Sequence, residues 1–242
     1  MYFNIVVMTV AVLSGASAAL VGFGIGSIMT PILAISLGVK AAVIIVAIPH
    51  FVATTYRCWS LRESIDRDVL IRFGSMSAAG GLIGAALYSY VPNAALSLIF
   101  ASLLILAGCA GLSGANKRIK LRGTASWVAG GLSGMFGGLV GNQGGIRSAA
   151  LLGFDLSKES FVATATAVGV IVDCVRIPIY LLRGWSDIEK NLPLISIITL
   201  GTITGTIIGV RCLRSVPEQI FAKIVSLAIL ILGLAFAYKS CF

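Results

Sequence analysis

Charged side chains are scarce in this sequence. Asp, Glu, Lys and Arg together make up 11% of its 242 residues, whereas soluble domains carry about a quarter. Hydrophobic residues reach 58%, and the mean hydropathy is +1.02. No soluble core needs so much apolar surface, so the composition excludes a soluble globular protein. At about 20 apolar residues per crossing, the length allows about seven or eight membrane helices joined by short loops.

Residues that usually carry enzymatic or metal chemistry are also sparse. The chain has one histidine, and its five cysteines form neither a CxxC pair nor a Cys/His cluster, which argues against a metal site and a disulfide framework. HExxH is absent, and His50 has no evident Gly-x-Ser partner, so we expect no enzymatic activity and no cofactor. The first apolar run, Tyr2–Val21, lacks a basic n-region and is interpreted as part of the mature fold.

Acidic residues are half as frequent as basic ones, nine against 18, which gives a formal net charge of +9. Basic loops that fix the orientation in the membrane explain most of this excess. Attraction of an anionic solute is the competing explanation. We therefore predict a small anionic solute, a lipid bilayer as the surroundings and no nucleic-acid partner. A homodimer is an open alternative.

Eight long apolar runs are the predicted membrane helices. Two shorter pieces, Ser27–Leu37 and Ile146–Phe154, follow the first and fifth runs after glycine-rich breaks, and each is long enough for about half a bilayer. The sequence thus predicts an all-α integral membrane protein with about seven or eight spans and two re-entrant or half-helices. The long runs are Tyr2–Val21, Ala41–Leu61, Val69–Tyr90, Ala94–Leu112, Thr124–Val140, Glu159–Leu182, Ile188–Val210 and Gln219–Tyr238.

Features of the first half of the chain recur in the second half. Ordered matches of this kind, with one insertion, predict two homologous transmembrane repeats, residues 1–115 and 124–242, joined by a basic cytoplasmic linker at 116–123. Ser14–Gly22 matches Ser133–Gly141 at an offset of 119 positions, and Gly80, Gly84 and Val91-Pro92 match Gly205, Gly209 and Val216-Pro217 at an offset of 125.

Loop charges favour an inverted relation between the repeats over a parallel one. The linker carries four basic residues and no acid, which is typical of a cytoplasmic loop. The uncharged turn Val91–Asn93 is then outside, whereas its counterpart near Arg211 and Arg214 is basic and expected inside. Inversion requires an odd number of crossings per repeat, so the first run and its half-helix would form a re-entrant hairpin.

The two glycine-rich breaks are the first candidate solute site. Backbone that leaves a helix at membrane depth must be buried in protein or line a wet cavity, and the following half-helix directs free N–H groups and a positive dipole end at the break. Two such ends would form an anion site, although glycines that only allow close helix packing are the competing interpretation. The candidate anion-binding residues at the breaks are Gly24, Gly26, Asn142, Gln143, Gly144 and Gly145.

Charged residues within the apolar runs are further candidates. Arg147 follows the second break, and its guanidinium suits a planar or tetrahedral oxyanion, although it could also reach the headgroups. Asp173 and Arg176 are three residues apart and share a helix face. A structural ion pair and a solute or proton site are both open for them.

Four other polar positions have two interpretations each. His50 could relay protons or form a structural hydrogen bond. Thr164 and Thr166 could donate to a solute or bond to their own helix. Arg57 lies 119 positions before Arg176 and is its candidate counterpart, although it is close enough to the loop to reach the headgroups.

These features resemble the sulfite exporter TauE/SafE family of membrane permeases. The likeness spans nearly the whole chain: two repeats, each with a GxGGG-type motif and a half-helix, followed by a helix rich in Ala and Thr. In the second repeat it is carried by Ala163–Thr166 and Arg176–Gly184. Ile25 stands where the family motif has a glycine, and Arg147 is unusual for the half-helix.

The resemblance implies a permease for a sulfur oxyanion or organosulfonate, such as sulfite or sulfoacetate, in a bacterial inner membrane. The residues by themselves predict a small anion held by the breaks, Arg147, Arg176, Thr164 and Thr166 and moved by alternating access. His50 and Asp173 are the proton-coupling candidates. A passive anion channel and a non-transporting membrane scaffold are the alternatives, and the direction of transport stays open.

Overall fold

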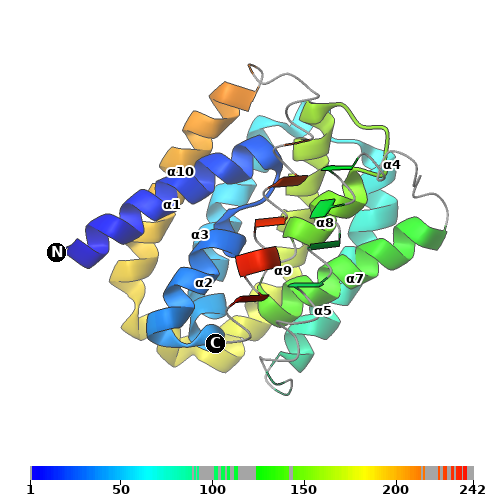
Figure 1. Ribbon diagram of the computed structural model, residues 1–242. Coiled ribbons are helices and arrows are strands. Elements are labelled where there is room, and N and C mark those ends of the chain that lie inside the picture. Colours follow the sequence, from blue (N-terminus) through cyan, green and yellow to red (C-terminus); the bar gives the residue numbers. More distant parts are fainter. Residues whose placement is uncertain are drawn as a thin grey trace.

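The computed structural model describes residues 2–88, 90, 92, 101–102, 105–106, 108–109, 112–113, 124–141, 144–213, 215, 223, 226–227, 230–231, 233–235 and 237–238. Over these residues the secondary structure is helical, without strands, and five helices are long and apolar enough to cross a membrane. The elements are α1 (Tyr2–Val21), α2 (Ile25–Leu37), α3 (Val39–Ser60), η1 (Arg62–Ser64), α4 (Arg67–Val69), η2 (Leu70–Gly74), α5 (Ser75–Leu87), α7 (Thr124–Val140), α8 (Gly144–Leu151), α9 (Lys158–Lys190) and α10 (Leu192–Leu213) (Figure 1).

Most predicted helices agree with the structure. The bounds of α1 and α7 are those predicted, and α2 and α8 follow the breaks as helices of 13 and 8 residues. The break predicted between Leu182 and Ile188 falls at Gly184, where the backbone is non-helical and α9 kinks, but the residues after the kink are helical up to Lys190 and not a loop. The predicted runs 94–112 and 219–238 lie largely outside the described residues.

Two pairs of helices pack closely through glycine, α1 along α10 and α5 along α7. Small residues let membrane helices approach until backbone touches backbone. A Cβ on any of the glycines concerned would meet the backbone of the facing helix more closely than real Cβ atoms do. The contacts place Gly15 against the carbonyl of Thr202, Gly205 against that of Val12, Gly134 against that of Ser77 and Gly80 against that of Gly131.

Helices α3 and α9 pack against each other in antiparallel directions at the centre of the molecule (Figure 1). Arg57, near the end of α3, bonds to Thr166 in the first half of α9. Ile44, near the start of α3, contacts the Gly184 kink at the far end of α9. The two helices therefore cross the bundle side by side in opposite senses.

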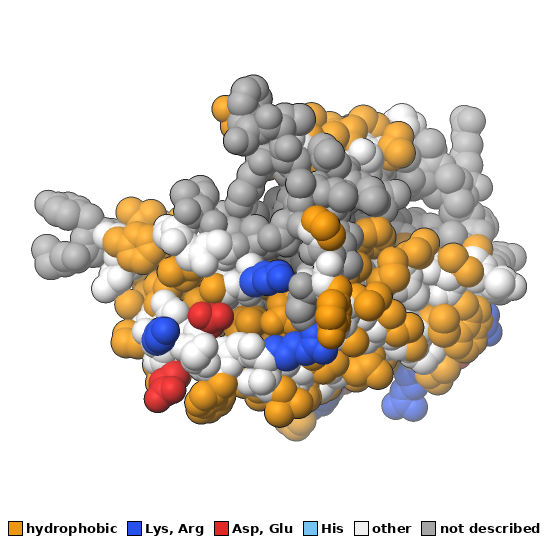
Figure 2. All heavy atoms as spheres, turned by 90° about the horizontal axis from the view of Figure 1, so that it is seen from below, with side chains coloured by type: hydrophobic (Ala, Val, Ile, Leu, Met, Phe, Trp, Pro, Cys, Tyr) orange, Lys and Arg blue, Asp and Glu red, His pale blue; other side chains and the backbone are white. Residues whose placement is uncertain are grey.

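The surface and the interior differ as expected for a chain that faces lipid. Large hydrophobic side chains such as Ile5, Leu13 and Leu200 are exposed, and hydrophobic side chains cover much of the face seen in Figure 2. The buried charged side chains among the described residues, together with His50, in contrast gather on α3, α8 and α9. The polar interior is therefore the place to look for a site.

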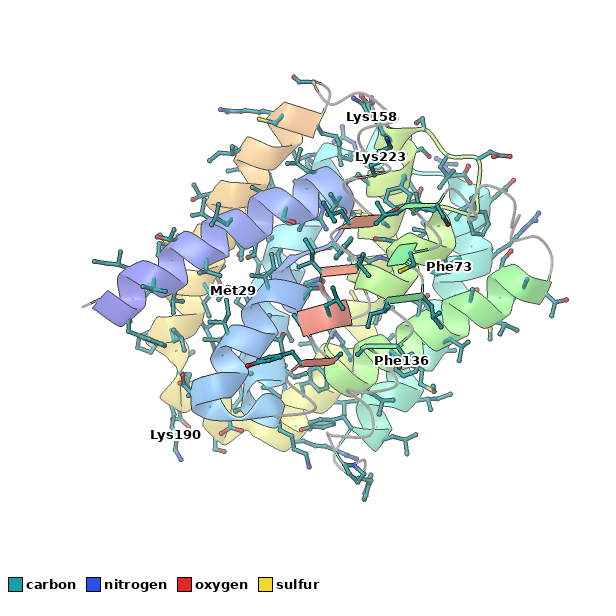
Figure 3. The ribbon with its side chains drawn as sticks, in the orientation of Figure 1. Met29, Phe73, Phe136, Lys158, Lys190 and Lys223 are labelled. Atoms are coloured by element: carbon teal, nitrogen blue, oxygen red, sulfur yellow. The ribbon has the colours of Figure 1, made fainter. Side chains whose placement is uncertain are left out.

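The two ends of α9 define the two ends of the bundle, and Lys158 and Lys190 mark them in Figure 3. The turn after α5 lies at the Lys190 end, because Tyr88 packs on Tyr180 with ring centroids 5.3 Å apart. The end of α10 lies at the Lys158 end, because Leu213 belongs to the same hydrophobic cluster as Phe161. The turns that follow α5 and α10 are thus at opposite ends.

Candidate anion-binding site

The two glycine-rich breaks meet inside the bundle. Gly22 and Gly141 start the breaks with φ of 82° and 68°, a left-handed conformation that glycine adopts without steric cost. A Cβ on Gly26 would lie 2.7 Å from the carbonyl oxygen of Gly141, and Gly144 packs against the side chain of Phe23. The structure therefore brings the first break against the second.

The remaining break residues have different positions. Gly24 has a φ of 152° and packs against α1, where a Cβ would lie 3.0 Å from the carbonyl oxygen of Ser14. Gly145 is in the first turn of α8. Asn142 and Gln143 lie outside the described residues, so their candidacy stays a prediction.

Arg147 reaches from α8 to the first break. Its side chain is 1% exposed, and Nη2 donates to the carbonyl oxygen of Gly22 at 3.0 Å. Within the described part of the chain, Nε and Nη1 of Arg147 have no hydrogen-bond partner. The alternative that Arg147 reaches the headgroups is wrong, because the guanidinium is enclosed by protein.

Arg57 is a second buried arginine, which the sequence analysis named as the counterpart of Arg176 but did not include among the predicted anion-binding residues. It is 1% exposed, and its Nε donates to Oγ1 of Thr166 at 2.7 Å. Its Nη1 has no partner among the described residues. The available signal was its alignment with Arg176, but a position near the helix end is also typical of arginines that reach headgroups.

The guanidinium groups of Arg57 and Arg147 lie along one face of α9. Arg57 contacts Thr166, and a Cβ on Gly169 would lie 3.0 Å from Nη1 of Arg147 and 3.4 Å from Cγ2 of Thr54. Residues three apart on a helix are about 5–6 Å from each other. Three helices therefore bring the two arginines together. Helix α3 carries Arg57 and Thr54, α8 carries Arg147, and α9 supplies the surface that both arginines contact.

Arg176 differs from these two arginines because its donors are used within the protein. Nε and Nη2 each lie 2.8 Å from Oδ1 of Asp173, and Nη1 donates to the carbonyl oxygen of Gly137 at 2.9 Å. Tyr180, one turn later on α9, donates to the carbonyl oxygen of Gly138 at 2.7 Å. The pair Asp173–Arg176 thus holds the end of α7, just before the second break.

His50 is bound to the same carboxylate. Its Nδ1 lies 2.6 Å from Oδ2 of Asp173, and Oγ1 of Thr54 is 3.5 Å from the same nitrogen. The ring also approaches the first break, because His50 Cδ2 would be 4.0 Å from a Cβ on Gly26. The structure therefore joins both proton-coupling candidates in one hydrogen bond.

The two candidate threonines make hydrogen bonds within the protein. Thr166 donates to the carbonyl oxygen of Val162 at 2.6 Å, as in the alternative of a bond to its own helix, and accepts from Arg57. Thr164 accepts the backbone N–H of Asp66 at 2.9 Å. Thr166 therefore positions Arg57, whereas Thr164 fixes the segment between η1 and α4.

The described residues contain no group of three or more His, Cys, Asp or Glu side chains arranged to hold a metal ion. The described cysteines at positions 58, 109, 174 and 212 are free thiols. Among the described residues, the buried groups that can carry a charge in the central cluster are three arginines, the carboxylate of Asp173 and the imidazole of His50.

Comparison with known proteins identifies the family. The family model described as "Sulfite exporter TauE/SafE" matches residues 7–236. Neither the curated proteins nor the solved structures contain a match to this chain. The family match and the five long apolar helices make the chain an integral membrane protein, and the family is one of transporters rather than enzymes. The chain belongs to the sulfite exporter TauE/SafE family.

Proposed function

We propose that this protein is a secondary transporter that moves a small anion across the cell inner membrane by alternating access. A sulfur oxyanion or organosulfonate such as sulfite or sulfoacetate is the proposed solute class. The observation that carries the proposal is Arg147, which is buried where the two breaks meet and has two nitrogens without a described partner.

An anion is the ligand that this environment favours. A buried charge is costly unless it is paired, and charged residues at membrane depth usually serve a solute or ion pathway. The N-terminal end of α8, which begins at Gly144, adds its positive dipole end beside Arg147. An oxyanion between the breaks would accept hydrogen bonds from the free nitrogens of Arg147. It would be stabilised by the charge of the guanidinium and by the positive dipole end of α8.

The packing supports two inverted repeats with the proposed bounds 1–115 and 124–242. The contacts of Gly15, Gly205 and Gly209 between α1 and α10 have counterparts at Gly134, Gly80 and Gly84 between α5 and α7, at the offsets of 119 and 125. The equivalent helices α3 and α9 run antiparallel, and the turns after α5 and α10 are at opposite ends. Inverted repeats around a central site are the usual basis of alternating access.

Re-entrant hairpins account for the odd number of crossings that inversion requires. Helix α10 starts just after Lys190, and α1 packs parallel to it, so α1 also starts at the Lys190 end. Helix α2 then leads back to the start of α3, which lies at the Lys190 end as well. The pair α7 and α8 leads from the Lys158 end back to α9 at that end. Helix α7 starts at the Lys158 end, because Gly130 in its first half contacts Phe73, which clusters with Phe161. We propose that this end, which the basic sequence 116–123 precedes in the chain, is cytoplasmic.

Counterflow in liposomes tests the transport proposal. With protein reconstituted and uptake of sulfite, sulfate, sulfoacetate and taurine measured, we expect saturable exchange of at least one anion. Arg147→Gln should lower the rate at low anion concentration by about 100-fold, since charge-assisted hydrogen bonds are each worth about 1.5–3 kcal/mol. Arg62→Gln, at an exposed position beside Trp59, is the matched control and should exchange like the wild type.

Three results would contradict the proposal. Absence of exchange for all four solutes by folded protein favours the scaffold alternative. Flux without saturation or counterflow favours the channel. Full activity of Arg147→Gln would place the anion away from the breaks.

His50 is the proposed proton-coupling group. It faces Asp173 and Arg176 from α9 and Arg147 from α8, so a proton on the imidazole adds a positive charge to the cluster that holds the anion. We expect a pH gradient across the vesicle membrane to change the initial rate of anion uptake in the wild type and not in His50→Gln. An equal response of both proteins to the gradient would rule out this role.

A further inference from the structure

We propose that Arg57 and Arg147 form a single site for a doubly charged anion, in which each arginine neutralises one of the two negative charges. This inference rests on the proposed transport of an anion and adds the charge of the solute and a second ligand, Arg57. Doubly charged solutes of suitable size include sulfate and organic sulfonates that also carry a carboxylate.

The first argument is geometric. Arg57 and Arg147 come from opposite repeats, yet both reach the face of α9 that carries Thr166 and Gly169. Glycine at position 169 leaves room for the guanidinium, because a Cβ would lie 3.0 Å from Nη1 of Arg147, which is a tight contact. Thr166 holds Nε of Arg57, while Nη1 at the end of that guanidinium has no partner among the described residues.

The second argument is the unused donor capacity. Nη1 of Arg57 and both Nε and Nη1 of Arg147 lack partners within the described residues, although both side chains are 1% exposed. Buried polar groups are nearly always hydrogen-bonded. Three unsatisfied guanidinium nitrogens from two side chains at one place point to a ligand rich in acceptor oxygens.

The third argument is charge balance. Asp173 neutralises Arg176 at 2.8 Å, whereas neither Arg57 nor Arg147 forms a salt bridge with a described residue. With His50 neutral, the buried cluster therefore carries two uncompensated positive charges, which also repel each other. An anion of charge −2 removes both, while an anion of charge −1 leaves one buried charge unpaired.

The equivalent positions of the repeats supply a direct test. Thr54 lies three residues before Arg57, as Asp173 lies three residues before Arg176, and the two pairs are 119 positions apart. Thr54→Asp would give the first repeat the carboxylate that it lacks and so neutralise Arg57 internally. The site would then hold one uncompensated charge, which suits an anion of charge −1.

The experiment measures binding by isothermal titration calorimetry in detergent and counterflow in liposomes. The probes are sulfoacetate, with a sulfonate and a carboxylate, and 2-hydroxyethanesulfonate, which has a similar size and one charge. We expect the wild type to bind sulfoacetate at least about tenfold more tightly, because the second charge is paired in a site shielded from water. Thr54→Asp should reverse this preference and bind 2-hydroxyethanesulfonate more tightly than sulfoacetate. Thr54→Asn introduces a side chain of the same shape as Asp without its charge and should still prefer sulfoacetate.

The outcomes separate this inference from the proposed function. Equal affinity of the wild type for both probes, or the same preference in Thr54→Asp and Thr54→Asn, overturns the doubly charged site while leaving anion transport intact. If Thr54→Asp does not fold, Arg57→Gln decides instead: it should lose most of the preference for sulfoacetate, and an unchanged preference overturns the proposal. Failure of the folded wild type to bind or exchange any anion overturns the proposed function itself.

Discussion

The two proposed repeats have an arginine at equivalent positions of their alignment, and the two arginines have different surroundings. Arg176 in the second repeat is neutralised by Asp173 and bonds to the carbonyl of Gly137. Arg57 in the first repeat has Thr54 where the second repeat has its carboxylate, and one of its terminal nitrogens is unsatisfied among the described residues. The comparison teaches that the arginine of the second proposed repeat is used within the protein, whereas its counterpart in the first keeps an unused donor, which is the basis of the proposed site.

The helix interfaces are alike where the arginines differ. The contacts of Gly15 with Thr202 and of Gly134 with Ser77 repeat each other across the two glycine-lined interfaces. The central pair α3 and α9, in contrast, places His50 opposite Gly169 in the repeat alignment, and the space above Gly169 is occupied by Arg147. Symmetric contacts therefore hold the scaffold, and the departures from symmetry coincide with the proposed site.

The largest expected effect comes from removing the carboxylate of the second repeat. Asp173→Asn leaves the buried Arg176 without its counter-charge and takes the charged acceptor from His50. Breaking a buried ion pair in this way typically costs about 3–5 kcal/mol. We expect a large loss of folded protein, measured as the unfolding free energy or the thermal midpoint in detergent.

The control for this change is Asp68→Asn, at an exposed position in α4, which should leave stability nearly unchanged. The double variant Asp173→Asn/Arg176→Gln should recover part of the loss, because no unpaired guanidinium remains. A cost for Asp173→Asn no larger than that for Asp68→Asn would mean that Arg176 is not held by the carboxylate, and the contrast with Arg57 would disappear.

Hydropathy and glycine patterns predicted the positions of the helices well. The bounds of α1 and α7 follow directly from apolar runs that stop at Gly22 and Gly141. The sequence placed the break after Leu182, close to the kink at Gly184, but the charges at Arg183 and Asp187 made the helical residues around and after the kink resemble a loop. A helix that emerges from the lipid can continue with charged side chains in water, and α9 does so with a kink at Gly184.

The candidate site could be predicted only in part, because its contacts join residues far apart in the sequence. Arg147 was identified by its place after the second break, and Asp173 with Arg176 by their spacing. The burial of Arg57 depends on Thr166, 109 positions away, which no local pattern reveals. Which of the arginines is neutralised is likewise a tertiary property, since the sequence offers Asp173 without showing what else it contacts.

A smaller effect tests whether the two glycine-lined interfaces are equivalent. Gly15→Ala and Gly134→Ala each place a Cβ against a backbone carbonyl of the facing helix, Thr202 in one case and Ser77 in the other. Overpacking of this kind costs about 1–3 kcal/mol, so we expect similar losses in thermal unfolding from both variants. Gly131→Ala is the control, because its Cβ would have ordinary contact at 3.6 Å with Met76. A large cost at one interface alone would break the symmetry of the scaffold, and the difference between Arg57 and Arg176 would then no longer be an exception within matched repeats.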